Sequence, residues 1–100
     1  MMQGRYEQGR KAEKQMQSFH YTISDEQGIH ARPAGILAKE AKKYKSEIKI
    51  KKDDKEAAAT QLLKMMGLGI KYNDQITVSI EGEDEESACE AMKRFFRENL

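Results

Sequence analysis

The segment Gly28-Ile29-His30-Ala31-Arg32-Pro33-Ala34 holds the residues most capable of chemistry in this chain of 100 residues. His30 can act as a nucleophile, because a neutral imidazole nitrogen carries a lone pair. Arg32, two residues later, can offer a fork of guanidinium donors to the oxygens of an anion. A run with helical spacing follows, so the free N–H groups of a helix start would face the same anion. Together these residues predict a site that accepts and donates a phosphoryl group through histidine.

A plainer interpretation of the same segment stays open from the residues alone. His30 could simply cap the helix, and Arg32 could be a solvated charge. Pro33 fits either interpretation, because a proline in the first turn of a helix loses no hydrogen bond.

The pattern of apolar residues predicts the elements that position this segment. Alternation predicts strands over 18–23, 47–52, 55–59 and 75–81, with a turn at Asp53-Asp54. Helical spacing predicts helices over 30–44, 61–66 and 84–99. The apolar positions of the first predicted helix are Ala34, Ile36, Leu37, Ala38, Ala41 and Tyr44. The order β-α-β-β-α-β-α predicts an α+β domain whose helices cover one face of a sheet.

Composition excludes several classes of protein. A net charge of +1 argues against a dedicated nucleic-acid binder, and a single cysteine cannot form a disulfide within the chain. No apolar run approaches the roughly 18–20 residues that span a bilayer, and no signal-peptide pattern is present. We therefore expect one small cytoplasmic domain without direct membrane insertion.

The first fifteen residues differ in character from the rest of the chain. They hold four basic and two acidic residues, whereas residues 16–100 hold 14 basic and 15 acidic ones. They show no sustained apolar period, so they can bury little surface. We interpret 1–15 as a flexible leader (an upstream start, a cloning remnant or a true arm) and 16–100 as the folding domain.

The string from Gly28 to Ala34 resembles the active-site motif of the HPr family, the histidine-containing phosphocarriers of the phosphoenolpyruvate-dependent sugar phosphotransferase system. Two further blocks match in the same order, LLKMMGLGI at 62–70 and ITVSIEGEDE at 76–85. The resemblance covers residues 16–100. The expected fold is an open-faced β-sandwich, in which three helices cover one face of a four-stranded antiparallel sheet.

The resemblance implies a role for each residue of the motif. His30 falls on the histidine that carries phosphate on Nδ1, and Arg32 on the arginine that steadies the phosphoryl group. The phosphoryl group would come from phosphorylated enzyme I and pass to the IIA domain of a sugar permease. The chain would then be a covalent carrier with no turnover of its own, a monomer that uses no cofactor and binds no nucleic acid.

The resemblance also implies an apolar docking patch for both partners, formed by Ala31, Gly35, Leu62, Leu63 and Met66. A physical argument supports it independently. The short predicted helix 61–66 has more apolar side chains than one buried face needs, so some should be exposed. The alternative is that all of its apolar residues lie in the core.

One position departs from the family pattern. Gram-positive members begin the second helix with a serine that a dedicated kinase phosphorylates, and here that position is Gln61. Ser46 lies between the first helix and the second strand and cannot substitute for it. Thr60 is adjacent and could cap the helix. Regulation through a serine kinase is therefore in doubt for this chain.

The remaining reactive side chains favour structural interpretations. His20 sits on the polar face of a predicted strand, and Cys89 is expected to be a small, partly buried hydrophobic residue. Two distant histidines and one cysteine predict no metal site. The eight lysines between 39 and 55 are more typical of a solvated face than of an RNA site, because only Tyr44 could stack on a base.

Two other functions remain possible from the sequence. One is a regulatory binding module that keeps the docking surface without carrying phosphate, although intact His30 and Arg32 argue against it. The other is a phosphocarrier of a parallel system, linked to nitrogen regulation or to dihydroxyacetone, with the same chemistry and different partners.

Overall fold

The computed structural model describes residues 16–100, so the leader predicted at 1–15 lies outside the described residues. The elements, in chain order, are β1 (Gln17–Thr22), α1 (Ala31–Ala41), β2 (Glu47–Lys52), β3 (Lys55–Ala58), α2 (Leu62–Met66), β4 (Gln75–Glu81) and α3 (Glu85–Asn99). This order confirms the β-α-β-β-α-β-α pattern.

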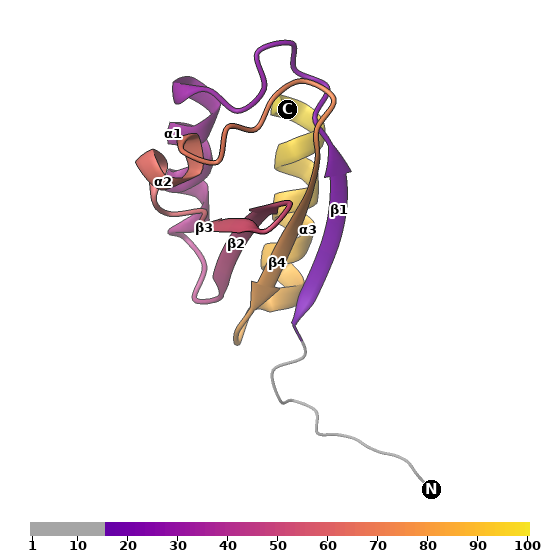
Figure 1. Cartoon of the computed structure of the whole chain (residues 1–100). Helices are drawn as coiled ribbons and strands as arrows, with labels where there is room; N and C mark the ends of the chain where they lie inside the picture. Colours follow the sequence, from indigo (N-terminus) through magenta and orange to yellow (C-terminus); the bar gives the residue numbers. More distant parts are fainter. Residues whose placement is uncertain (1–15) are drawn as a thin grey trace, which may run out of the picture.

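The four strands form one sheet in the order β1-β4-β2-β3, and every neighbouring pair is antiparallel. All three helices lie on one face of this sheet (Figure 1). The other face carries the exposed side chains of each strand, such as Ser18 and His20 of β1. The fold is therefore the expected open-faced β-sandwich.

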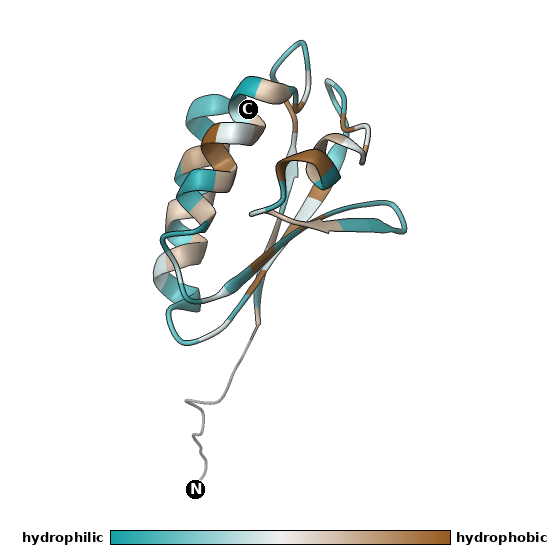
Figure 2. Ribbon diagram, turned by 90° about the vertical axis from the view of Figure 1, so that its left-hand side faces the viewer, coloured by the Kyte–Doolittle hydropathy of each residue, from teal (hydrophilic) through white to brown (hydrophobic). Residues whose placement is uncertain are grey.

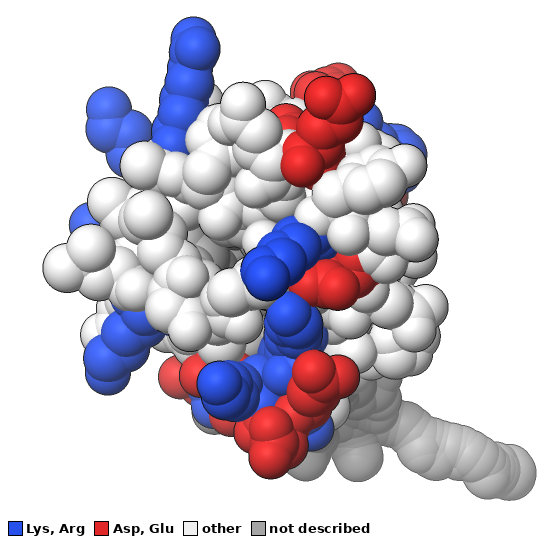
Figure 3. Space-filling view, turned by 45° about the horizontal axis from the view of Figure 1, so that its top comes forward, with Lys and Arg blue, Asp and Glu red and all other residues white. Residues whose placement is uncertain are grey.

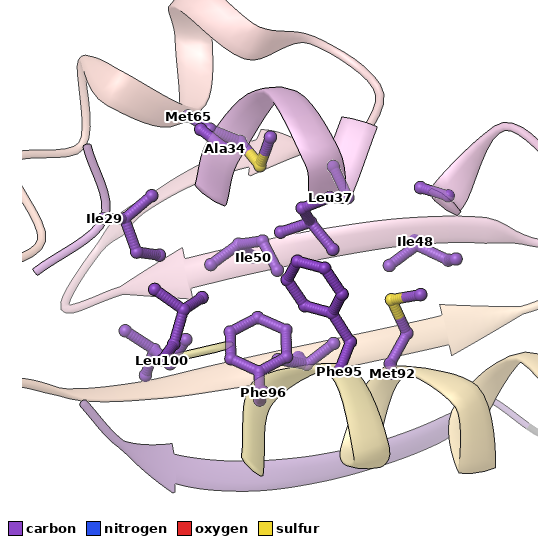
Figure 4. Packing of buried hydrophobic residues seen from close by; sticks show 14 of the residues in the cluster. Ile29, Ala34, Leu37, Ile48, Ile50, Met65, Met92, Phe95, Phe96 and Leu100 are labelled. Carbon is purple, nitrogen blue, oxygen red and sulfur yellow. The ribbon is translucent and has the colours of Figure 1, made fainter. Parts of the chain in front are cut away.

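The core lies between the sheet and the helices. Ile48 and Ile50 on β2 and the apolar residues of β4 are buried, as the alternation predicts. Phe96 of α3 is fully buried in this core (Figure 4). Phe19 and Tyr21 of β1 meet its ring edge-to-face. Figure 2 colours the ribbon by hydropathy and shows the charged turn between β2 and β3 in teal, the hydrophilic end of the scale.

Helix α1 differs from its prediction in two respects. It ends at Ala41 instead of continuing to Tyr44, because the N–H groups of Lys43 and Tyr44 donate to carbonyls only three residues earlier and close tight turns. Ile36 was expected among the inward apolar residues, but its side chain is 47% exposed. The buried residues at 34, 37, 38 and 41 form one side of the helix, and Ile36 falls on the side of Arg32, four residues earlier.

A side-chain bridge joins the start of α3 to the segment before β2. The Asp84 carboxylate accepts hydrogen bonds from the N–H groups of Lys45 and Ser46, both at 2.9 Å, and from the Ser46 hydroxyl at 2.5 Å. These hydrogen bonds hold the pKa of Asp84 below its ordinary value, and the bond from the Ser46 hydroxyl has the largest effect. Asp84 thus ties two segments together instead of capping its own helix.

We predict that Asp84→Asn lowers the free energy of unfolding at neutral pH by about 1 kcal/mol, a modest value because solvent reaches this carboxylate. A carboxyl whose pKa is depressed by folding stabilises the protein above its unfolded pKa of about 3.9. The difference between wild type and Asp84→Asn should therefore hold from pH 8 to pH 5 and shrink as the pH falls below about 4. Urea unfolding at a series of pH values measures it.

Glu83→Gln is the matched control, because Glu83 pairs with Lys45 at 3.6 Å while both side chains are more than three-quarters exposed. It should change stability by less than about 0.5 kcal/mol. Two results would contradict the role given to Asp84: wild type and Asp84→Asn having equal free energies of unfolding at pH 7, or a difference between them that is as large at pH 2 as at pH 7.

Candidate functional site

The loop between β1 and α1 is held by backbone hydrogen bonds to a distant part of the chain. The N–H groups of Ser24 and Asp25 donate to the Leu100 oxygen at 2.6 and 2.9 Å, and the Ser24 hydroxyl donates to the same oxygen at 3.0 Å. Leu100 is itself buried in the core. The first half of the loop is therefore attached to the end of α3.

The second half of the loop is attached to the segment after α2. Gly28 has a φ of +68°, which favours glycine, and a Cβ there would clash with the Ile70 carbonyl oxygen and lie 2.7 Å from the Lys71 Cα. The next residue, Ile29, is buried and donates its N–H to the Ile70 oxygen at 3.2 Å. Only glycine allows this close approach, and the approach sets where α1 begins.

His30 is the residue at the N-cap of α1, in extended backbone conformation, and its side chain makes no capping hydrogen bond. The imidazole therefore does not cap the helix. Its side chain is 37% exposed. The Ala34 N–H donates to the His30 carbonyl at 3.0 Å, and Pro33 has no N–H, so the N–H groups of Ala31 and Arg32 lack intrahelical partners.

A shallow depression surrounds the imidazole. It is lined by Asp25, His30, Arg32, Pro33, Ile36 and Asn99. Arg32 is exposed, and no residue between 16 and 100 forms an ion pair or hydrogen bond with its guanidinium. The structure thus brings together the two residues that the sequence predicts for the chemistry, and the Arg32 guanidinium is free to bind an anion.

Asp25 was missed as a site residue, because Asp25-Glu26-Gln27-Gly28 reads as an ordinary turn sequence. One of its carboxylate oxygens, Oδ1, lies 4.0 Å from Nε2 of His30. The position of Asp25 depends on its bond to Leu100, which is remote in sequence, and no local pattern predicts such a contact.

The expected docking residues lie on α1 and α2, which pack against each other (Figure 1). Leu63 is 81% exposed and Met66 39% exposed, Leu62 is partly buried against the core, and Met65 is fully buried. The alternative that all four lie in the core is wrong. Figure 2 shows α2 as a largely hydrophobic helix.

We use the name α1–α2 patch for the neighbouring residues that present little or no charge on these two helices. They are Ala31, Gly35, Ile36, Leu62, Leu63 and Met66. Ile36 is an addition to the predicted set, and its place four residues after exposed Arg32 is the signal that could have found it. In Figure 3 the left-hand part of the face, over α1 and α2, is largely uncharged, and Lys and Arg side chains project at its edges.

The start of α2 carries no hydroxyl at its cap. Gln61 is the N-cap residue and is exposed, with no side-chain capping bond, so the expectation that Thr60 caps the helix is not met. Ser46 is buried, and its hydroxyl donates to Asp84. Ser46 is thus withdrawn from the surface, as expected for a residue that cannot replace a regulatory serine.

The remaining reactive side chains have structural partners. Nδ1 of His20 lies 2.9 Å from the Thr77 hydroxyl on the exposed sheet face. Cys89 is buried, and burial raises the pKa of its thiol. Lys52 donates to Asp74 at 2.8 Å, so part of the lysine-rich stretch is paired.

Residues 16–100, the part of the chain that the structure describes, lack two features. No three histidine, cysteine, aspartate or glutamate residues in this part of the chain gather in a way that could hold a metal ion. Within the same residues, none of the helices has the length and hydropathy needed to cross a membrane.

Fold and site together define a small open-faced β-sandwich that presents a partly exposed histidine at a helix start beside an apolar surface. The family model described as the phosphorylation site of the PTS HPr component matches residues 17–98. Phosphocarrier protein HPr of Mycoplasma genitalium is 45% identical over 85 residues, which cover 84% of this chain and 97% of that protein. The chain therefore belongs to the HPr family of phosphocarrier proteins.

Solved structures agree with this assignment. The HPr of Bacillus anthracis superposes with a TM-score of 0.76 at 33% identity, covering 81% of this chain and 96% of that one. A histidine-containing phosphocarrier protein from Mycoplasma gives a TM-score of 0.77 at 37% identity, over 79% of this chain and 90% of that one.

Proposed function

We propose that this protein carries a phosphoryl group on Nδ1 of His30, in the cytoplasm, between phosphorylated enzyme I and the IIA domains of sugar permeases. The observation that carries the proposal is that His30 occupies the N-cap of α1 while its side chain leaves the cap unused. The imidazole is partly exposed and makes no capping bond at the point where a helix binds anions best. Membership of the HPr family supports the same role.

The chemistry follows from the groups present. Nδ1 is the ring nitrogen nearer the backbone, which favours it over Nε2 for a phosphoryl group that the free N–H groups of Ala31 and Arg32 also hold. The Nδ1 lone pair attacks phosphorus, the bond between phosphorus and the donor atom of phosphorylated enzyme I breaks, and its electron pair returns to that donor atom. Phosphoryl oxygens would be held by those N–H groups and by the Arg32 guanidinium. The reverse displacement by an acceptor on the IIA domain completes the transfer.

Docking is assigned to the α1–α2 patch. Its apolar residues adjoin the depression around His30, because Ile36 belongs to both. Methionine suits a surface that binds more than one partner, since its flexible side chain can repack. Exposed Arg32, Lys39 and Lys64 lie on the same two helices and favour acidic partners. The contacts should be small and short-lived, because a carrier must leave one partner to reach the next.

Labelling with phosphoenolpyruvate and enzyme I tests the carrier role. We expect wild type to take one acid-labile, base-stable phosphate and His30→Ala to take none. His20→Ala is the matched control, because it removes the other histidine, which lies on the exposed sheet face, and it should be labelled like wild type. Absence of label on wild type, or equal label on His30→Ala, would favour the regulatory binding module instead.

Truncation of the most exposed patch residue tests docking. We predict that Leu63→Ala weakens binding to enzyme I about 5–30-fold, the effect of losing 1–2 kcal/mol at an interface. Its free energy of unfolding should change by less than about 0.5 kcal/mol, because the side chain is 81% exposed. Titration calorimetry and urea unfolding measure the two quantities.

Met16→Ala serves as the control for docking, since Met16 is also exposed and precedes β1, at the end of the domain remote from α1 (Figure 1). It should bind enzyme I like wild type. Equal binding by wild type and Leu63→Ala would remove Leu63 from the docking surface.

We also propose that this chain escapes control by an ATP-dependent serine kinase. Gln61 has no hydroxyl to phosphorylate, and the Ser46 hydroxyl is buried against Asp84. With ATP and a Gram-positive kinase of this kind, wild type should take no phosphate, whereas Gln61→Ser should gain a site at the exposed start of α2. Mass spectrometry locates any label, and phosphate on Thr60 or Ser46 of wild type would refute the proposal.

A further inference from the structure

Asp25 is held rigidly beside the imidazole. Its N–H donates to the Leu100 oxygen at 2.9 Å, its carbonyl accepts the Gly28 N–H at 2.9 Å, and its side-chain Oδ1 accepts the Gln27 N–H at 2.8 Å. With three bonds around one residue, the carboxylate has little freedom to turn away. Its Oδ1 lies 4.0 Å from Nε2 of His30, and both side chains are about one-third exposed.

We propose that Asp25 is a positioning residue that keeps the proton of His30 on Nε2 and so leaves the lone pair on Nδ1. The inference rests on the proposed function, in which Nδ1 forms the bond to phosphorus. A neutral imidazole has one N–H and one acceptor nitrogen, and the partner of one nitrogen decides which is which. An ionised carboxylate can only accept, so it favours the tautomer whose N–H faces it.

The same carboxylate acts in both directions of transfer. When the N–P bond forms at Nδ1 while Nε2 keeps its proton, the ring becomes positively charged, and the neighbouring carboxylate stabilises that charge. When the N–P bond breaks, the electron pair returns to Nδ1 and the phosphoryl group passes to the acceptor nucleophile. No proton has to leave or enter Nε2 in either step.

The charge on the His30 imidazole also depends on the other side chains around the ring. The charged side chains that line the two depressions beside His30 are Asp25 and Glu26 from the loop and Arg32 from α1, while α3 contributes the uncharged Asn99. Arg32 is suited to the phosphoryl oxygens and Asp25 to the ring. The turn itself does not require a charge, because a neutral oxygen at position 25 could accept the Gln27 N–H equally well. The charge of Asp25 can therefore be removed while the turn is kept.

Asp25→Asn in the full chain tests the inference, with Glu26→Gln as the control that removes an equal charge from the other acidic residue of the loop, which lines a depression with His30 but forms no ion pair with it. The first readout is the tautomer of neutral His30, obtained from the ¹⁵N shifts of its ring. We expect Nε2–H to predominate in wild type and in Glu26→Gln, and its ratio to Nδ1–H to fall about fivefold in Asp25→Asn, as loss of a charge 4 Å away predicts. An unchanged ratio would overturn the inference.

The second readout is the pH dependence of phosphate loss from the labelled protein. Loss is faster when Nε2 is protonated, because a positively charged ring is the better leaving group. In Asp25→Asn the rate profile should move to lower pH by roughly half a unit to one unit, and in Glu26→Gln it should stay in place. A profile that does not move in Asp25→Asn would also overturn the inference.

Failure of the proposed function and failure of the role of Asp25 give different results. Failure of wild type to take phosphate would contradict the proposed function, whereas labelling of wild type with identical tautomers and profiles in Asp25→Asn would contradict the role of Asp25 alone. Asp25→Ser, whose hydroxyl can also accept the Gln27 N–H, provides a second uncharged variant if Asp25→Asn does not fold. It should show the same two changes.

Discussion

The hydrogen bond from the Ile29 N–H to the Ile70 oxygen fixes where helix α1 begins, and the whole site depends on that point. Gly28 makes the bond possible, because any side chain there would press on the backbone of Ile70 and Lys71. On the other side, the Leu100 oxygen holds Ser24 and Asp25. His30 therefore stands where three distant segments meet, so its surroundings are set by the packed core and do not rely on a free loop.

This arrangement separates the chemistry from the docking surface. The reacting group is placed by backbone bonds, whereas α2 is anchored by fully buried Met65 and partly buried Leu62. Truncation of Met65 to alanine would cost about 2–5 kcal/mol. Leu63 and Met66 are then left on the surface at little cost to the core. A carrier needs both properties, because the geometry at His30 must stay constant while the surface meets successive partners.

The sequence predicts the strands more closely than it predicts the end of α1 or the surroundings of His30. The strands β2 and β4 have the predicted bounds, because one buried face forces strict alternation at residues such as Ile48 and Ile50. The end of α1 and the exposure of Ile36 were mispredicted, because neighbouring turns and packing decide them. The structure brings His30 and Arg32 together, as their spacing predicts. The approach of Asp25 to His30 depends on Leu100, and a contact so remote in sequence leaves no local pattern.

The proposed function requires that the free N–H groups at the start of α1 hold a phosphoryl group on His30. Amide ¹H–¹⁵N spectra of the free and phosphorylated protein test it most directly. A phosphoryl group bound there should move the amide protons of Ala31 and Arg32 downfield and slow their exchange with solvent, while amides in the middle of α3 stay in place. Phosphate on His30 that leaves the Ala31 and Arg32 amides unchanged would contradict the account.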